Sequence, residues 1–132
     1  TPNEREARFA LGDQDTVVRP LALKLYQAAG CKTLILKLGD RGTITYRSAK
    51  GDVRDFFTID SFADRLIDSV GAGDALLAYT TLGVLVTKSP VIGSILGSLA
   101  AAVACERDGN YAVSRSDLEA KINLVEKQAN YK

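Results

Sequence analysis

The sequence predicts an α/β fold in which helices flank a small layered sheet. Two helix-like segments come first, three short strand-like segments follow between residues 32 and 59, and three helix-like segments complete the chain. This arrangement of helices around strands is typical of layered α/β proteins. The chain has 132 residues and shows neither an internal repeat nor a linker, so we expect one domain or part of one.

Two helices are expected before the first strand. The first begins at once, with Thr1 or Asn3 as its cap, acidic residues in its first turn, and an end near Gly12. The second begins after residues 13–15, because apolar residues then recur at helical spacing until Gly30, which ends it.

Three strands are expected next. Residues 32–38 have the sequence KTLILKL, which is apolar on both faces and typical of a strand buried between layers. Glycine-containing turns separate this strand from two further strands, at 43–47 and 53–59. The segment 61–67 is ambiguous between a loop and a short strand.

Three helices are expected in the rest of the chain, over the ranges 71–86, 90–106 and 116–128. Ser89 suits the cap of the middle helix, because Pro90 then falls at the first helical position. Ser116 and Glu119 have the spacing of a capping box at the start of the last helix.

Composition excludes several functional classes. The formal net charge of +1 gives no field that attracts nucleic acid or anionic lipid, and the absence of histidine excludes histidine-based triads and histidine-ligated zinc. Cys31 and Cys105 are far apart and lack metal-ligand spacing, so we expect small buried side chains in a reducing compartment. The apolar segment 91–105 is too short to cross a bilayer. We therefore expect a cytoplasmic protein that binds neither nucleic acid nor membrane.

The stretch LIDSVGAGDALLAY, residues 66–79, carries the strongest chemical signal. A glycine turn that enters a helix, here Gly71-Ala72-Gly73, presents backbone amides without helical partners, and such amides favour an anion such as phosphate. Asp74 then places a negative charge beside that anion. A carboxylate in this position has a use if it takes a proton from an attacking hydroxyl while the amides hold the transferred group.

Other interpretations of this stretch stay open. Asp74 could cap the helix while the glycines only form the turn. A dinucleotide-binding fingerprint is disfavoured because Leu76 occupies the third small position, and a Walker-type loop is excluded because no G-K-[ST] follows.

Two weaker motifs precede the stretch 66–79. Asn3 and Glu6 form N-x-x-E on one helix face and offer oxygen ligands suited to magnesium or its water shell, although an ordinary acidic helix start has the same pattern. Gly39 and Gly42 form L-x-L-G-x-x-G after the first strand, at a strand end where α/β sheets bind ligands. A plain hairpin turn is the alternative there.

In this order and spacing, N-x-x-E, L-x-L-G-x-x-G and D-x-x-G-A-G-D resemble the motifs of the PfkB/ribokinase family of small-molecule kinases, over residues 3 to about 120. The last motif is the most specific. The resemblance implies the C-terminal portion of a ribokinase-like three-layer (α/β/α) Rossmann-like fold. It also implies ATP-dependent phosphoryl transfer to a sugar or sugar-phosphate hydroxyl. The T-P-N-x-x-E opening looks most like heptose-phosphate kinases.

The same resemblance implies roles for the catalytic residues. Asp74 would be the base that deprotonates the acceptor hydroxyl, and the amides of Gly71, Ala72 and Gly73 would form the anion hole for the γ-phosphoryl group. Asn3 and Glu6 would help to position Mg²⁺, mainly through water.

Further residues would contact the nucleotide or a cation. Asp68 and the Gly109 turn resemble a monovalent-cation region of some family members. The nucleotide-binding candidates are Lys37, Gly39 and Gly42 near the phosphates, and Ser98, Ala101 and Ala102 along the adenine pocket. Lys37 replaces a common threonine, so an ammonium would take the place of a hydroxyl there. Simple helix packing is the alternative for the adenine-pocket residues.

Members of this family are considerably longer. The resemblance implies that residues 1–132 are a single partial domain, the C-terminal nucleotide-binding half, without the N-terminal substrate-binding and lid part. We expect this chain alone to phosphorylate nothing, and to associate with the missing part or with a second copy through an exposed sheet edge. A nucleotide-binding or regulatory module without catalysis is the alternative, although a retained Asp74 argues against it.

Overall fold

Helices and strands follow one another in the predicted order in a computed structural model, which describes residues 1–130. The chain divides into two units, Thr1–Ser61 and Phe62–Lys132, which are described separately below. The first unit holds the sheet and two helices, and the second holds three helices. The prediction of a single partial domain stays a prediction.

An antiparallel sheet of three strands forms the centre of the first unit. Its strands pair in the order β1-β2-β3, with bounds β1 (Leu34–Lys37), β2 (Thr43–Tyr46) and β3 (Phe56–Ile59). The short 3₁₀ helix η1 (Gly39–Arg41) connects β1 to β2, and the pair Lys37–Thr43 closes this hairpin.

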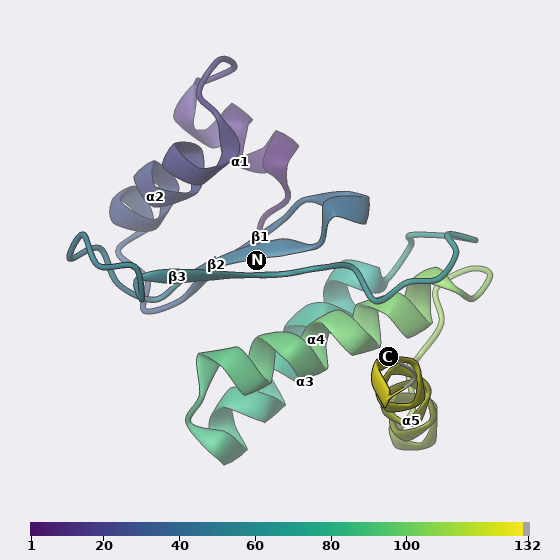
Figure 1. Ribbon diagram of the computed structural model, residues 1–132. Coiled ribbons are helices and arrows are strands. Elements are labelled where there is room, and N and C mark those ends of the chain that lie inside the picture. The colour runs from purple at the N-terminus through teal and green to yellow at the C-terminus, as the bar shows by residue number, and fades with distance from the viewer. Residues whose placement is uncertain (131–132) are drawn as a thin grey trace. The chain divides into compact units, whose positions relative to one another are not determined.

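Two helices cover one face of this sheet, α1 (Glu4–Leu11) and α2 (Val18–Ala29) (Figure 1). Alternate strand residues such as Leu36 and Ile44 point to the helices and pack with Leu21 in a buried cluster. Ile35 and Thr45 alternate with them on the other face and are buried as well. This confirms the expectation that the strand is buried on both faces.

Both helices end as the sequence predicts. Gly12 and Gly30 occupy the C-caps with φ of 60° and 58°, in the left-handed region that glycine adopts without steric cost. Asn3, rather than Thr1, is the N-cap of α1.

The predicted strand at 53–59 is shorter than expected, since β3 begins only at Phe56. The buried carboxylate of Asp55 accepts hydrogen bonds from the amides of Gly51 (2.7 Å) and Asp52 (3.0 Å). These bonds fold residues 51–55 into a turn, so this part of the chain cannot extend the strand. Residues 61–67, all within the described chain, form no strand, which resolves the ambiguity in favour of a loop.

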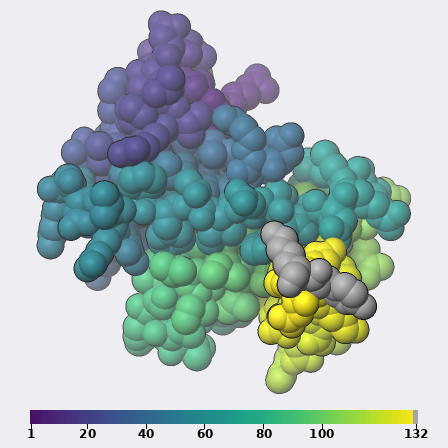
Figure 2. Space-filling model, in the orientation of Figure 1, coloured from purple at the N-terminus to yellow at the C-terminus, as the bar shows by residue number. Residues whose placement is uncertain are grey.

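The second unit is built on a pair of closely packed helices, α3 (Ala72–Thr87) and α4 (Pro90–Cys105). Glycines allow the close approach: a β-carbon on Gly97 would lie 2.0 Å from the Thr80 hydroxyl and 2.6 Å from the Leu76 carbonyl. The residues of α4 form the green part of the surface in Figure 2. In the part of the chain that the structure describes, no helix is long and apolar enough to cross a membrane.

The last helix, α5 (Arg115–Asn130), packs on α4 through Leu118 and begins earlier than expected. The predicted capping box of Ser116 and Glu119 is wrong by two residues. Ser114 and Asp117 form it instead: the Asp117 amide donates to Ser114 Oγ (3.2 Å), and the Ser114 amide donates to Asp117 Oδ2 (2.9 Å). Glu119 forms an ion pair with Arg115 at 2.7 Å.

Candidate active site

The turn before α3 leaves several amides without acceptors. Gly71 is the N-cap, and its φ of 80° is a left-handed conformation that reverses the chain direction. The Ala72 amide donates to the Ser69 carbonyl at 3.2 Å, whereas the amides of Gly71, Gly73 and Asp74 have no acceptor in the described chain. Amides of this kind at a helix N-terminus can bind an anion.

Asp74 lies in the first turn of α3 and is exposed. Its carboxylate makes no hydrogen bond or ion pair with any residue that the structure describes. The interpretation of Asp74 as a helix cap is therefore wrong, because Gly71 occupies that position. A carboxylate without a protein partner next to amides without acceptors is an arrangement that can accept a proton beside a bound anion.

Asp68 holds the loop that leads into this turn. Its Oδ1 accepts a hydrogen bond from the Val70 amide (2.9 Å), and its Oδ2 accepts one from the Gly109 amide (3.2 Å). The structure thus brings Asp68 and the Gly109 turn together, as the sequence predicts. The Cys105 carbonyl accepts a hydrogen bond from the Ile67 amide (2.8 Å). Burial raises the pKa of the Cys105 thiol, so this thiol stays uncharged.

Asn110 follows Gly109 and is a site residue that the sequence did not indicate. Its side chain lies directly against Gly71: a β-carbon on Gly71 would come within 2.2 Å of the Asn110 side-chain oxygen. Asn110 therefore borders the turn that carries the free amides. A single sequence holds no signal for such a contact, because the two residues are far apart along the chain.

The three adenine-pocket candidates lie on α4. Ala102 is buried, Ala101 is half-buried, and Ser98 is 9% exposed. The Ser98 hydroxyl has no hydrogen-bond partner in the described chain. The hydroxyls of Thr43 and Thr80 are buried without a partner in the same way, so this feature does not distinguish a nucleotide contact from helix packing.

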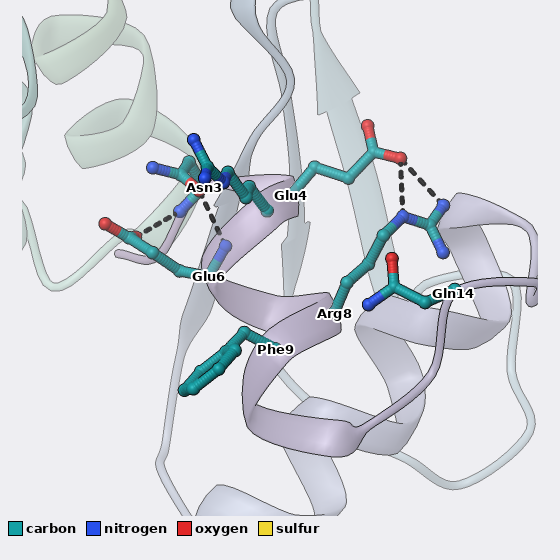
Figure 3. A pocket seen from close by; sticks show the side chains of 7 residues that line it. Asn3, Glu4, Glu6, Arg8, Phe9 and Gln14 are labelled. Carbon is teal, nitrogen blue, oxygen red and sulfur yellow. Dashed lines mark hydrogen bonds and ion pairs between the residues drawn. The ribbon is translucent and has the colours of Figure 1, made fainter.

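Within the first unit, Asn3 and Glu6 form a capping box at the start of α1 (Figure 3). The Glu6 amide donates to Asn3 Oδ1 at 2.8 Å, and the Asn3 amide donates to Glu6 Oε2 at 2.7 Å. Both residues line an open cleft of about 740 Å³, together with Glu4, Arg5, Arg8, Phe9 and Gln14. No cluster of three or more acidic, histidine or cysteine side chains suited to a metal occurs in residues 1–130.

The turn after β1 is tied to α1. Lys37 pairs with Asn3 in a parallel β-bridge, and the Lys37 amide donates to the Pro2 carbonyl at 2.9 Å. Glu4 binds both Arg41 of η1 and Arg8, and the hydrogen bond from Arg8 lowers the pKa of Glu4. The structure therefore brings the candidates Asn3 and Lys37 together.

The two glycines of this turn are used differently. Gly39 has a φ of 65° and open space around its α-carbon, whereas a β-carbon on Gly42 would lie 2.0 Å from the Ile59 carbonyl oxygen. Only glycine therefore fits at Gly42, directly before β2.

Comparison with known proteins decides the family. The model of the pfkB family of carbohydrate kinases matches residues 1–117. The chain belongs to this family. No curated protein matches the sequence.

Solved structures confirm the ribokinase-like α/β fold of this pfkB family member. Ribokinase from Thermotoga maritima is 26% identical with a TM-score of 0.77, over 92% of this chain and 41% of that one. Phosphofructokinase-2 from Escherichia coli, solved with potassium, is 20% identical with a TM-score of 0.78, over 95% of this chain and 40% of that one. Ribokinase from Giardia lamblia is 20% identical with a TM-score of 0.74, over 90% of this chain and 42% of that one. The chain thus spans about two fifths of the length of these structures.

Proposed function

We propose that this chain is the nucleotide-binding part of a kinase that transfers a phosphoryl group from ATP to a sugar hydroxyl. The observation that carries the proposal is the N-terminus of α3, where amides without acceptors adjoin the unpartnered carboxylate of Asp74. Family membership supports the reaction class. The chain spans 41% of ribokinase from Thermotoga maritima, so the activity of a whole kinase is part of the proposal.

In the proposed reaction, Asp74 accepts the proton of the sugar hydroxyl while the hydroxyl oxygen bonds to the γ-phosphorus. The bond between the γ-phosphorus and the leaving ADP oxygen breaks. The amides of Gly71 and Gly73 donate to the oxygens of the transferred group and stabilise their charge. Ala72 contributes fully only if its amide leaves the 3.2 Å hydrogen bond to Ser69.

Magnesium, when bound, would neutralise phosphate charge. The capping box engages Asn3 Oδ1 and Glu6 Oε2, so these residues suit contact through metal-bound water better than direct ligation. Both oxygens of Asp68 already accept amides, so a monovalent cation there would have to share them. The potassium in the Escherichia coli phosphofructokinase-2 structure supports such a cation for the fold.

Lys37, Gly39 and Gly42 would lie near the nucleotide phosphates, and Ser98 with Ala101 and Ala102 would contact the adenine. The proposed acceptor is a sugar or a sugar phosphate. Heptose phosphate is the specific acceptor that we propose, because the T-P-N-x-x-E opening resembles that of heptose-phosphate kinases. A panel of heptose phosphate, ribose and fructose phosphate, assayed with the natural protein that carries this sequence, tests this choice: faster turnover of ribose or fructose phosphate would refute it.

Calorimetric titration of the purified chain with inorganic phosphate and with Mg–ATP tests the anion site. We expect both to bind, and Asp74→Asn to bind phosphate at least as tightly, because it removes a negative charge beside the amides. Absence of binding would contradict the proposal.

A nucleotide-binding module without catalysis is the second candidate, because the amides without acceptors at the start of α3 would bind a phosphate whether or not a reaction follows. It predicts binding but no turnover of any sugar, even when this sequence is part of a longer protein.

A further inference from the structure

Lys121 of α5 is a buried charge outside the candidate active site. Its side chain is 4% exposed, and its Nζ lies 2.9 Å from Asp64 Oδ2 and 2.8 Å from Glu106 Oε1. A buried ammonium is costly unless carboxylates pair with it. Burial acts to lower the pKa of Lys121, but the hydrogen bonds to Glu106 and Asp64 outweigh burial and raise it, so the lysine stays charged.

The two carboxylates belong to different parts of the second unit. Asp64 lies in the loop that runs to the Gly71 turn, and Glu106 is the C-cap of α4. The Asp64 amide also donates to Glu106 Oε1 at 2.8 Å. Lys121 therefore closes a junction that holds the start of this loop on the end of α4.

Further along, the loop is held on the same end of α4. The amides of Ile67 and Asp68 both donate to the Cys105 carbonyl, and the Gly109 amide donates to the Asp68 carboxylate. Without the ammonium of Lys121, the carboxylates of Asp64 and Glu106 would face each other with no cation between them. Repulsion would then loosen the loop ahead of the Gly71 turn.

We propose that Lys121 is a positioning residue for the candidate active site. By holding Asp64 against Glu106, it fixes the loop 64–71 and so sets the place of the free amides at the start of α3. The proposal rests on the proposed function, since it assigns Lys121 to the same anion site. The α3–α4 pair is packed through its own glycines and does not depend on this junction.

Three variants test the proposal in the complete 132-residue chain. Lys121→Met keeps an unbranched side chain and removes the charge. Asp64→Asn weakens the junction from the loop side, where the side chain is 55% exposed. Arg115→Met is the matched control, because it breaks the ion pair to Glu119 on the same helix, where Arg115 is 91% exposed.

Each variant is characterised by two nuclear magnetic resonance measurements. The first is hydrogen exchange at the amides of Ile67, Asp68 and Val70. We expect about tenfold faster exchange in Lys121→Met, a smaller increase in Asp64→Asn, and no change in Arg115→Met. The second is a phosphate titration followed at the amides of Gly71 and Gly73. We expect at least about fivefold weaker phosphate binding in Lys121→Met and unchanged binding in the control.

Unchanged exchange at these amides in a folded Lys121→Met would overturn the proposal. So would faster exchange spread equally through α3 and α4, since Lys121 would then stabilise the unit without placing the loop. Faster exchange confined to the loop amides, with unchanged phosphate affinity, would also overturn the proposal. If Lys121→Met does not fold, Asp64→Asn decides by the same criteria. Failure of the unsubstituted chain to bind phosphate would contradict the proposed function, and the exchange data would still decide whether Lys121 holds the loop.

Discussion

The side chain of Asn110 lies against the α-carbon of Gly71, and a β-carbon on Gly71 would approach its oxygen to 2.2 Å. Gly71 also has a φ of 80°, and this left-handed conformation favours glycine at the turn into α3. An added β-carbon would in addition displace the Asn110 side chain, whose oxygen can rotate away.

Gly71→Ala tests both features of this turn together. We expect a loss of about 1–3 kcal/mol in the free energy of unfolding, because the substitution adds backbone strain and displaces the Asn110 side chain, and a loss of phosphate binding. Gly109→Ala is the control: its φ is 70°, but nothing lies within 4 Å of the added carbon, so only the strain applies. Unchanged stability of Gly71→Ala in urea denaturation would contradict this account of the turn.

A second pair of glycines tests the turn after β1. Gly42→Ala should cost about 3 kcal/mol or more, because the new β-carbon would lie 2.0 Å from the Ile59 carbonyl oxygen and push β3 away. Gly39→Ala has a comparable φ of 65° but open space, so we expect about 1–2 kcal/mol. Urea denaturation measures both, and a larger loss for Gly39→Ala would refute this account of the turn.

Much of the fold could be predicted because its signals are local. The helix ends at Gly12 and Gly30 and the Ser89-Pro90 start follow from the chemistry of single residues, and Ser89 Oγ does accept the Ile92 amide at 3.3 Å. The start of β3 was missed because Asp55 binds the amides of the preceding turn, and the sequence does not reveal which carboxylate is used in that way.

The candidate site was predictable in part. The glycine turn before α3 has a local signature, and so does the capping box of Asn3 and Glu6, whose metal role stays a prediction. The contacts of Asn110 with Gly71 and of Lys121 with Asp64 join residues from distant parts of the sequence. Only the packed chain brings such residues together, so periodicity and motif spacing could not indicate them.

A pH prediction concerns Asp13. Hydrogen bonds from Lys24 and from Thr16 lower its pKa strongly in the folded chain. A lowered folded-state pKa stabilises the protein fully above the unfolded value of about 4, and this contribution is lost as the pH falls below it. The stability advantage of the unsubstituted chain over Asp13→Asn should therefore shrink between about pH 5 and pH 2. Asp15→Asn is the control, and an advantage that grows toward low pH would contradict the assignment.

The most direct measurement of the central claim is the turnover of Asp74→Asn in the natural protein that carries this sequence, assayed with ATP and a sugar. If Asp74 is the base, kcat falls at least about 100-fold while KM for the nucleotide changes only a few-fold, because the amides that bind phosphate remain. Glu126→Gln, which removes an exposed carboxylate outside the candidate site, should retain full activity. A kcat for Asp74→Asn within a few-fold of the unsubstituted enzyme would contradict the claim.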